Sequence, residues 1–319
     1  MTVQSRSPTT TELVPVGDRG ARYGGSIVRR TVLKAFATLI ATSFAWTVGW
    51  AAKKSVAGRS LRWIAFYGQT ADEEVLSTYD IVVLDPMFLG SVATVAKDGA
   101  RVCAYLSLGE GRTSDPFYDR IDPAALLEEN SAWPGTRRID IRQPAWKDLV
   151  LGEIISSIAA KGFSGLMLDT LDTPPYLEQL DPVGKRGMAE AAVDLVQEIR
   201  RSYPEMLVIA NRGYALLPSI IDNIDGVIAE SLLTTPENDG SGRFKWNEQR
   251  DVALQLSLLA PAEARRLRVP ILSLDYWDPE DVETVKKIYS RQRHLGHHPY
   301  VATPVLDRII PEPDQHSAP

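Results

Sequence analysis

The sequence predicts an α/β protein whose main part is a (β/α)8 TIM barrel, preceded by a segment for export. From residue 61 to about residue 310, short apolar runs alternate with helical segments. The runs are almost continuously apolar, which is typical of parallel strands buried on both faces. A length of about 250 residues is also usual for such a barrel. A doubly wound open sheet is the alternative arrangement for the same alternation.

Eight apolar runs are the candidate strands, and helical patterns fill most of the intervals between them. The strands are residues 63–67, 81–84, 102–108, 165–168, 207–210, 226–229, 270–274 and 299–302. Apolar residues recur on one face of residues 146–160 and again over residues 188–199. Asp278 and Pro279 predict a further helix start, with the aspartate as N-cap and the proline in the first turn. The barrel is therefore expected to span residues 58–310, with a frayed tail at 311–319.

The first 57 residues differ in composition from the rest. Residues 1–28 are polar without a periodic apolar pattern, which predicts a disordered extension. Residues 29–57 begin with Arg29-Arg30, contain an uncharged stretch at 35–52 and end in small residues, as in a twin-arginine signal read by the export machinery. The alternative is an uncleaved membrane anchor through residues 35–52. Either reading places the barrel outside the cytosol, in the periplasm or beyond the cell.

Charge narrows the range of partners. The chain has 35 Lys and Arg against 41 Asp and Glu, and without residues 1–57 the counts are 27 and 39, a net charge of −12. Nucleic acid is an unsuitable partner because its phosphates require the opposite sign. An acidic domain attracts a cationic ligand, although solubility is an equally simple explanation of the charge.

Neither a metal nor a cofactor is expected. The single cysteine, Cys103, lies in an apolar run and reads as a small buried hydrophobic residue. No Cys or His spacing suggests a zinc site, and His294, His297 and His298 precede the last strand, at the end of the barrel opposite the active site. No Gly-rich phosphate loop follows the first strand.

Polar side chains follow most of the predicted strands. In a barrel the carboxyl ends of the strands meet at one mouth, where active sites form. A single carboxylate after a buried run is more often a helix cap than a catalyst, but here five of the eight strands end near one. These carboxylates are Asp85, Glu110, Asp169, Glu230 and Asp275. Two acids with aromatic and amide groups at one mouth are what glycoside cleavage requires.

Several segments resemble the endo-α-1,4-polygalactosaminidase family, glycoside hydrolase family 114. Residues 105–110 read Tyr-x-Ser-x-Gly-Glu, residues 165–172 read Gly-x-x-x-Asp-x-x-Asp, and residues 209–213 and 274–276 follow in the family's order. The resemblance covers nearly all of residues 61–305. It implies an α-retaining, endo-acting glycosidase with Asp169 as nucleophile and Glu230 as general acid/base. The implied substrate is an exopolysaccharide with α-1,4-linked galactosamine, partly deacetylated and therefore cationic.

Eight further residues are expected to line the sugar subsites. They are Tyr67, Tyr105, Ser107, Glu110, Asp172, Asn211, Asp275 and Tyr276. Arg212 departs from the family, which usually has Asn-Gly at this point, and a bulky cation here would narrow a subsite or disfavour a positively charged sugar. Because one fold supports many activities, two alternatives stay open. They are a catalytically weak carbohydrate-binding barrel of the cell envelope, and a polysaccharide deacetylase or lyase.

Overall fold

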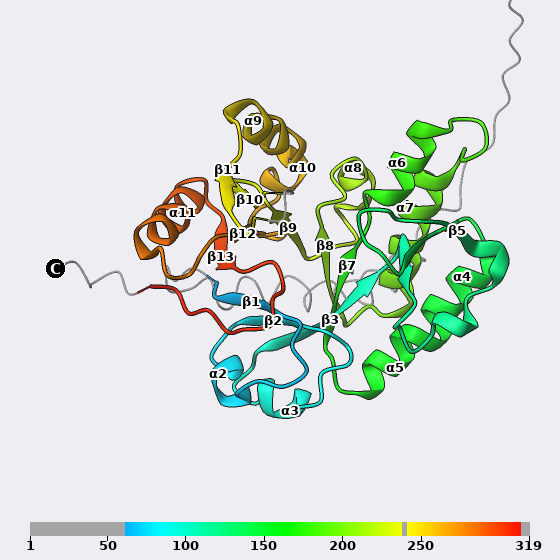
Figure 1. Ribbon diagram of the computed structural model, residues 1–319. Coiled ribbons are helices and arrows are strands. Elements are labelled where there is room, and N and C mark those ends of the chain that lie inside the picture. Colours follow the sequence, from blue (N-terminus) through cyan, green and yellow to red (C-terminus); the bar gives the residue numbers. More distant parts are fainter. Residues whose placement is uncertain (1–60, 238–240, 314–319) are drawn as a thin grey trace, which may run out of the picture. The chain divides into compact units, whose positions relative to one another are not determined.

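The computed structural model describes residues 61–237 and 241–313 of the chain (Figure 1). The extension predicted at residues 1–28 and the export signal or anchor predicted at 29–57 lie outside the described residues. Within the described ranges, no helix combines the length and the apolar character that a bilayer crossing requires.

Eight parallel strands form one sheet that curls into a nearly closed barrel (Figure 1). They are β1 (Trp63–Phe66), β2 (Ile81–Leu84), β3 (Arg101–Ser107), β7 (Gly165–Asp169), β8 (Leu207–Asn211), β9 (Gly226–Glu230), β12 (Ile271–Tyr276) and β13 (His298–Ala302). Each neighbours the next along the chain, without the reversal of order that a doubly wound sheet would show. The predicted barrel is confirmed, and every strand lies within two residues of its predicted bounds.

The barrel meets itself between β1 and β13, where no continuous strand ladder forms. The Trp63 indole N–H donates to the carbonyl of His298 at 2.8 Å, and the Leu61 N–H donates to the His298 ring at 3.2 Å. The rings of Trp63 and Tyr300 also pack edge to face, with centroids 5.9 Å apart. These contacts therefore hold β1 next to β13, where the two strands are not joined by a continuous backbone ladder.

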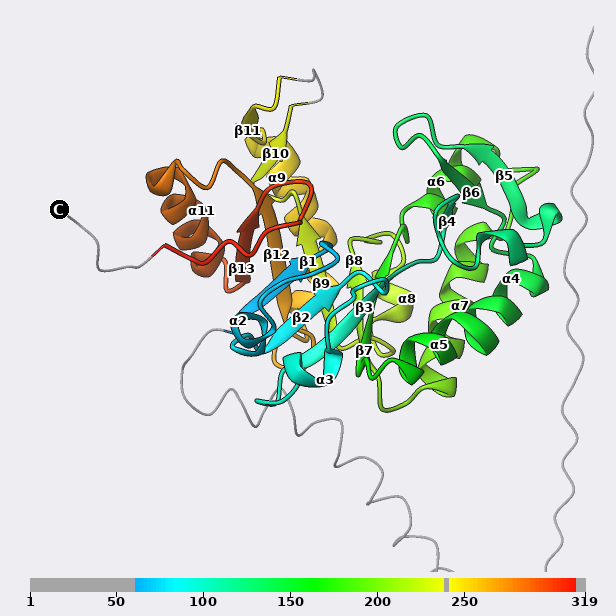
Figure 2. The same ribbon diagram turned by 60° about the horizontal axis from the view of Figure 1, so that its bottom comes forward.

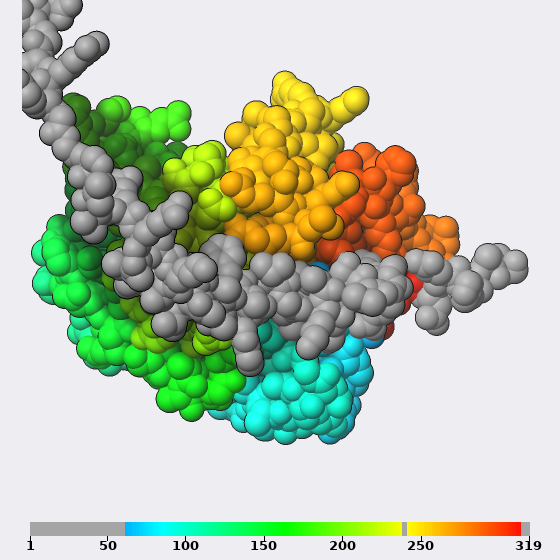
Figure 3. Space-filling view, turned by 180° about the vertical axis from the view of Figure 1, so that it is seen from behind, coloured from blue at the N-terminus to red at the C-terminus, as the bar shows by residue number. Residues whose placement is uncertain are grey.

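Helices cover the outside of the strands, which explains why the strands are buried along their length. They are α2 (Glu73–Ser77), α3 (Val92–Val95), α4 (Pro144–Leu149), the π-helix η4 (Val150–Ile154), α5 (Ile155–Ala160), α6 (Thr173–Leu180), α7 (Met188–Ser202), α8 (Leu217–Ile220), α9 (Gln249–Leu258), α10 (Ala260–Glu263) and α11 (Val282–His294). The space-filling view from behind shows the segments of α2 and α3 in blue to cyan, those of α4, η4 and α5 in green, and those of α9 and α11 in yellow to orange (Figure 3).

The helix predictions have mixed outcomes. The predicted helix at 146–160 is present as α4, η4 and α5 in succession, and the one at 188–199 is α7. The predicted start at Asp278 is wrong, because α11 begins at Val282 with Asp281 as its N-cap. The Asp281 carboxylate accepts from the N–H of Thr284 at 3.1 Å, whereas Asp278 only closes the preceding turn.

Two excursions extend from the carboxyl ends of the strands (Figure 2). The β4–β6 excursion follows β3 and pairs β4 (Glu110–Arg112), β6 (Thr136–Ile139) and β5 (Leu126–Glu129) into a small antiparallel sheet, with two short 3₁₀ helices, η2 (Tyr118–Arg120) and η3 (Pro123–Ala125), between β4 and β5. The β10–β11 excursion follows β9 and pairs β10 (Thr234–Pro236) with β11 (Phe244–Trp246).

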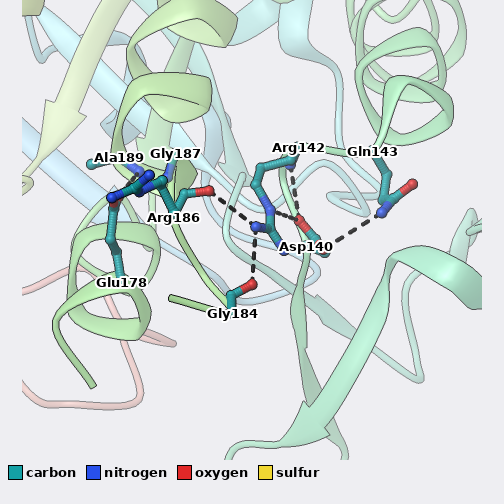
Figure 4. Close-up of polar contacts among 8 residues, drawn as sticks. All are labelled: Asp140, Arg142, Gln143, Glu178, Gly184, Arg186, Gly187 and Ala189. Carbon is teal, nitrogen blue, oxygen red and sulfur yellow. Dashed lines mark hydrogen bonds and ion pairs between the residues drawn. The ribbon is translucent and has the colours of Figure 1, made fainter. Parts of the chain in front are cut away.

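A partly buried ion pair fixes the base of the β4–β6 excursion to the barrel (Figure 4). Asp140, which follows β6, accepts two parallel hydrogen bonds of 2.8 Å from the guanidinium of Arg142. Arg142 also donates to the carbonyls of Gly184 and Arg186, in the loop between α6 and α7, at 3.1 and 3.0 Å. The bonds from Arg142 hold the pKa of Asp140 below its usual range.

Candidate active site

The same backbone conformation follows each of three neighbouring strands. The final residues of β7, β8 and β9 are Asp169, Asn211 and Glu230. The residue that follows each of them has a left-handed backbone: Thr170 (φ 58°), Arg212 (φ 51°) and Ser231 (φ 53°). Such a conformation costs about 1–2 kcal/mol for a residue with a Cβ atom, and it is found preferentially at functional sites. The chain thus leaves each strand abruptly, just after a side chain that faces the mouth.

Asn211 joins the two predicted catalytic carboxylates. Its Nδ2 donates to Asp169 Oδ1 at 2.9 Å and to Glu230 Oε2 at 2.7 Å. Only the NH2 group of the amide can donate hydrogen bonds to two carboxylates, so these contacts fix which side of the Asn211 amide faces them. Because both bonds end on one nitrogen, the two oxygen atoms lie no more than the sum of 2.9 and 2.7 Å, about 5.6 Å, apart. Retaining glycosidases separate their carboxyl groups by about 5–5.5 Å, and inverting ones by about 6.5–9.5 Å.

Each carboxylate also accepts a hydrogen bond from a tyrosine. Tyr105 donates to Asp169 Oδ2 at 2.8 Å, and Tyr276 donates to Glu230 Oε1 at 2.6 Å. Burial and the neighbouring negative charges raise the pKa of both phenols well above the ordinary value, so both remain donors at neutral pH. The ring of Tyr67 packs edge to face against Tyr105, with centroids 5.3 Å apart.

The surroundings of Glu230 suit an acid. Burial raises its pKa, and the charge of Asp169 adds to this, while the bonds from Asn211 and Tyr276 oppose it. Within residues 61–237 and 241–313, no Lys, Arg or His forms an ion pair with Glu230 or Asp169. Burial beside a second carboxylate therefore favours the protonated form of Glu230, which is the form that a general acid needs.

The pair lies in a cavity of about 380 Å³ that opens to solvent. This volume lies within the range of small-molecule pockets, about 300–1,000 Å³. Six of the eight predicted subsite residues line it, together with Asp169 and Glu230: Tyr67, Tyr105, Ser107, Glu110, Asn211 and Tyr276. A second cavity lies behind β3 and shares Tyr105, Ser107 and Arg112, but neither carboxylate of the pair lines it.

Asp172 lies on the rim and not in the cavity lining. It precedes α6 and pairs with the Nε of Arg212 at 3.2 Å, and both side chains are nearly half exposed. Arg212 also lies over the ring of Tyr214, 5.8 Å from its centroid. The ion pair with Asp172 holds the guanidinium of Arg212 on the rim. Arg212 therefore does not line the cavity, and it does not narrow a sugar subsite there.

Asp275 is not brought into the cavity either. Side chains alternate along β12, so Leu274 and Tyr276 face the cavity while Asp275 points to the outside of the barrel and is 1% exposed. Its carboxylate accepts from the backbone N–H groups of Leu233 and Thr234, both at 2.8 Å. Burial raises the pKa of Asp275 to about 6. This carboxylate fixes the start of the β10–β11 excursion to the barrel.

Other cavity residues were not among the predicted site residues. They include Asp85, which the sequence placed only at the end of the second strand, and Arg112, Asn130, Trp133 and Thr136 of the β4–β6 excursion. Arg112 pairs with Asp115 at 2.9 Å and with Asp85 at 3.5 Å. The available signal was Trp133, a large apolar residue within the turn-forming stretch Ser-Ala-Trp-Pro-Gly.

The histidines that the structure describes, His294, His297 and His298, lie away from the mouth. His297 is buried, with its ring nitrogens 2.8 Å from Gln292 Oε1 and 3.2 Å from Glu263 Oε1. His298 begins β13, at the amino end of that strand. In the part of the chain that the structure describes, no group of three or more His, Cys, Asp or Glu is arranged to hold a metal ion.

Comparisons with known sequences point to one family. The profile of glycoside-hydrolase family GH114 matches residues 45–317. An uncharacterised protein of Deinococcus radiodurans is 25% identical over 259 residues, which are 76% of this chain and 80% of the relative. An uncharacterised protein of Thermotoga maritima is 26% identical over 265 residues, which are 75% of this chain and 80% of the relative.

Solved structures show the same barrel. The glycoside hydrolase domain of PelA from Pseudomonas aeruginosa is 26% identical, with a TM-score of 0.70 over 79% of this chain and 98% of that domain. The crystal structure of Aspergillus fumigatus Ega3 in complex with galactosamine is 15% identical, with a TM-score of 0.59 over 78% of this chain and 93% of Ega3. The second likeness concerns the fold alone.

Proposed function

Because the chain belongs to glycoside-hydrolase family GH114, we propose that it cleaves a polysaccharide containing α-1,4-linked galactosamine, with retention of configuration. The observation that carries the proposal is the single amide of Asn211 shared by Asp169 and Glu230. It brings one oxygen atom of each carboxylate to the same nitrogen, at 2.9 and 2.7 Å, which supports the close spacing of a retaining pair.

In the first step Asp169 attacks the anomeric carbon of the reacting sugar. The bond from that carbon to the glycosidic oxygen breaks as Glu230 transfers its proton to the leaving oxygen. Tyr105 and Asn211 each donate to one oxygen of Asp169, which holds the nucleophile in place and stabilises its charge before attack. The product of this step is a glycosyl ester on Asp169 and a shortened chain.

In the second step Glu230, now ionised, accepts a proton from water as the water attacks the anomeric carbon and releases Asp169. The Asn211 amide can only donate to Glu230 Oε2, so the acid proton resides on Oε1. The Tyr276 hydroxyl donates to Oε1 when Glu230 is ionised, and when Glu230 is protonated it can rotate and accept a hydrogen bond from the O–H at Oε1. The glycosidic oxygen is accordingly expected to approach Glu230 from the side of Oε1.

The charge of the cavity supports a cationic sugar. Four carboxylates line it, Asp85, Glu110, Asp169 and Glu230, against one guanidinium, Arg112, which is already paired with Asp115 and Asp85. A protonated amino sugar would compensate this excess, whereas an acidic sugar would add to it. Galactosamine, the sugar bound in the Ega3 crystal structure, is the first sugar to test.

The test is to incubate the protein with soluble α-1,4-galactosamine polymer and follow new reducing ends by proton NMR. We expect α-anomeric ends to appear before mutarotation, because double displacement retains configuration. Endo action predicts that chain length falls steeply while few ends have formed. Asp169→Asn serves as the inactive control. Initial release of β-anomers, or no cleavage beyond that control, would contradict the proposal.

We also infer that the barrel acts outside the cytosol. The support is the sequence of residues 29–57, which lies outside the described structure. Replacing Arg29 and Arg30 together with lysine is expected to retain the protein in the cytoplasm, as measured by cell fractionation. Normal export of the double variant would contradict a twin-arginine signal and leave the barrel's activity untouched.

A further inference from the structure

Trp133 is placed unlike the other tryptophans that the structure describes. Trp63 and Trp146 are each 1% exposed in the core, and Trp246 and Trp277 pack against each other with centroids 5.9 Å apart. Trp133 is 69% exposed and lines the cavity of the carboxylate pair. In residues 61–237 and 241–313, no other aromatic ring and no cation packs on its ring. An exposed aromatic ring at the mouth of an acidic cavity is a surface for a ligand.

The turn that presents Trp133 is fixed by hydrogen bonds. The Trp133 N–H donates to the Asn130 carbonyl at 2.8 Å, and the Trp133 carbonyl accepts from the Thr136 N–H at 3.1 Å. Pro134 follows with its restricted backbone, and Gly135 supplies a left-handed residue with φ of 81°. The backbone of the turn therefore loses little conformational freedom when a ligand packs on the ring.

Asn130 connects this turn to a buried carboxylate in the same cavity. Its Oδ1 accepts from the Ala132 N–H at 3.1 Å, and its Nδ2 donates to both carboxyl oxygens of Glu110 at 3.0 and 3.2 Å. Glu110 is 6% exposed, and its other donor is the Thr173 hydroxyl at 3.0 Å. These donors are neutral, so they do not neutralise the charge of Glu110, and its Oε2 still has lone pairs for a further donor.

We propose that Trp133, Asn130 and Glu110 form a second sugar subsite, next to the one at the carboxylate pair. The subsite binds an amino sugar whose apolar ring face packs on Trp133 and whose ammonium group pairs with Glu110. This inference rests on the proposed galactosaminidase function and deepens it. The Ser107 hydroxyl links the two subsites, because it donates to the Glu110 carbonyl at 2.6 Å and contacts the Thr170 hydroxyl, beside Asp169, at 2.9 Å.

The stacking part is tested by substrate length. α-Galactosaminyl fluoride occupies only the reacting-sugar subsite, whereas an α-1,4-galactosamine hexamer reaches the second subsite as well. We expect Trp133→Ala to lower kcat/KM for the hexamer about tenfold, mainly through KM, and to change kcat/KM for the fluoride less than twofold. Trp133→Phe should keep most of the hexamer activity. Leu267→Ala, an 88% exposed apolar residue before β12, is the matched control and should change neither.

The charge part is tested by acetylation of the amino groups. We expect the wild type to prefer the deacetylated over the N-acetylated hexamer by several-fold more than it prefers the deacetylated fluoride. Glu110→Gln should remove that extra preference, while Trp133→Ala should preserve it. If Glu110→Gln does not fold, the wild-type comparison of hexamer with fluoride gives the same readout.

The outcomes distinguish a failure of the second subsite from a failure of the proposed galactosaminidase function. Cleavage of neither the hexamer nor the polymer by the wild type contradicts the proposed galactosaminidase function. Normal wild-type cleavage with equal losses on hexamer and fluoride in Trp133→Ala, or with no loss on either, overturns the second subsite alone. An acetylation preference that does not differ between hexamer and fluoride overturns the pairing of Glu110 with an ammonium group.

Discussion

Asp140 directly follows one strand and Glu230 ends another, and their surroundings give them opposite roles. Asp140 accepts two hydrogen bonds from the guanidinium of Arg142, which lower its pKa and keep it ionised. Glu230 contacts a phenol and an amide, and burial beside Asp169 raises its pKa. A carboxylate with its own cation is fixed as a structural group, whereas one beside only neutral donors and a second carboxylate can exchange a proton.

Asp275 shows that a raised pKa is not enough to identify a catalyst. Like Glu230 it lies among neutral donors, and burial raises its pKa to about 6. It is, however, buried on the outer side of β12, away from the cavity. There a series of hydrogen bonds leads from Asp275 through Gln292 and His297 to Glu263. Access to the cavity is therefore the feature that distinguishes the reactive acid from the structural one.

The largest effect is expected when the nucleophile is removed. Asp169→Asn keeps the shape of the side chain but cannot form the glycosyl ester, so turnover should fall by at least about 1000-fold. Its circular dichroism spectrum and melting temperature should stay close to those of the wild type. Activity above a few percent on a purified sample would mean that another residue attacks the sugar.

Glu230→Gln tests the acid. We expect a loss of about 100-fold on the natural polymer, but only a few-fold on an activated aryl glycoside that needs no proton for departure. The alkaline side of the wild-type pH profile should also disappear, since activity falls as Glu230, with its raised pKa, loses its proton. Equal losses on both substrates would contradict the acid role.

Arg142→Ala removes the cation from the structural carboxylate. We expect a loss of about 1–3 kcal/mol in the free energy of unfolding, measured in urea, with little change in kcat for the molecules that remain folded. The lost stability should be greatest at neutral pH and vanish in acid, because a lowered pKa contributes stability above the unfolded value and loses it as pH falls. Arg142→Lys should recover only part of it. A fall in kcat with unchanged stability would contradict this view of the pair.

The last effect is expected for Asp275 and concerns only how stability depends on pH. Its pKa is raised to about 6, so the folded state binds the proton more tightly than the unfolded state. The stability from this group is full below about pH 4 and is lost as pH rises through about 6, by about 3 kcal/mol, because one unit of pKa shift corresponds to about 1.4 kcal/mol. Asp275→Asn should flatten that slope in urea unfolding measured at several pH values. An unchanged slope would show that another group titrates.

The sequence predicted the barrel, and because parallel strands bring their carboxyl ends to one mouth, the structure places Asp169 and Glu230 next to each other as expected. It grouped Asp275 with Tyr276 as subsite residues, but the structure does not place Asp275 in the cavity. Side chains alternate along a strand, so two consecutive residues cannot both point to the same face. The β4–β6 excursion was not predicted, since its short strands are only partly buried and carry no regular pattern. Trp133 and Asn130 therefore had no strand end to mark them.

The left-handed residues Thr170, Arg212 and Ser231 have a consequence for how this site can change. They come directly after Asp169, Asn211 and Glu230 in the chain. The residues that set the backbone geometry are therefore different from the residues that carry the reactive groups. Point substitutions at 169, 211 and 230 can thus alter the chemistry while the turns persist. For evolution or design, this mouth is a scaffold on which a new reaction requires new side chains and no new loops.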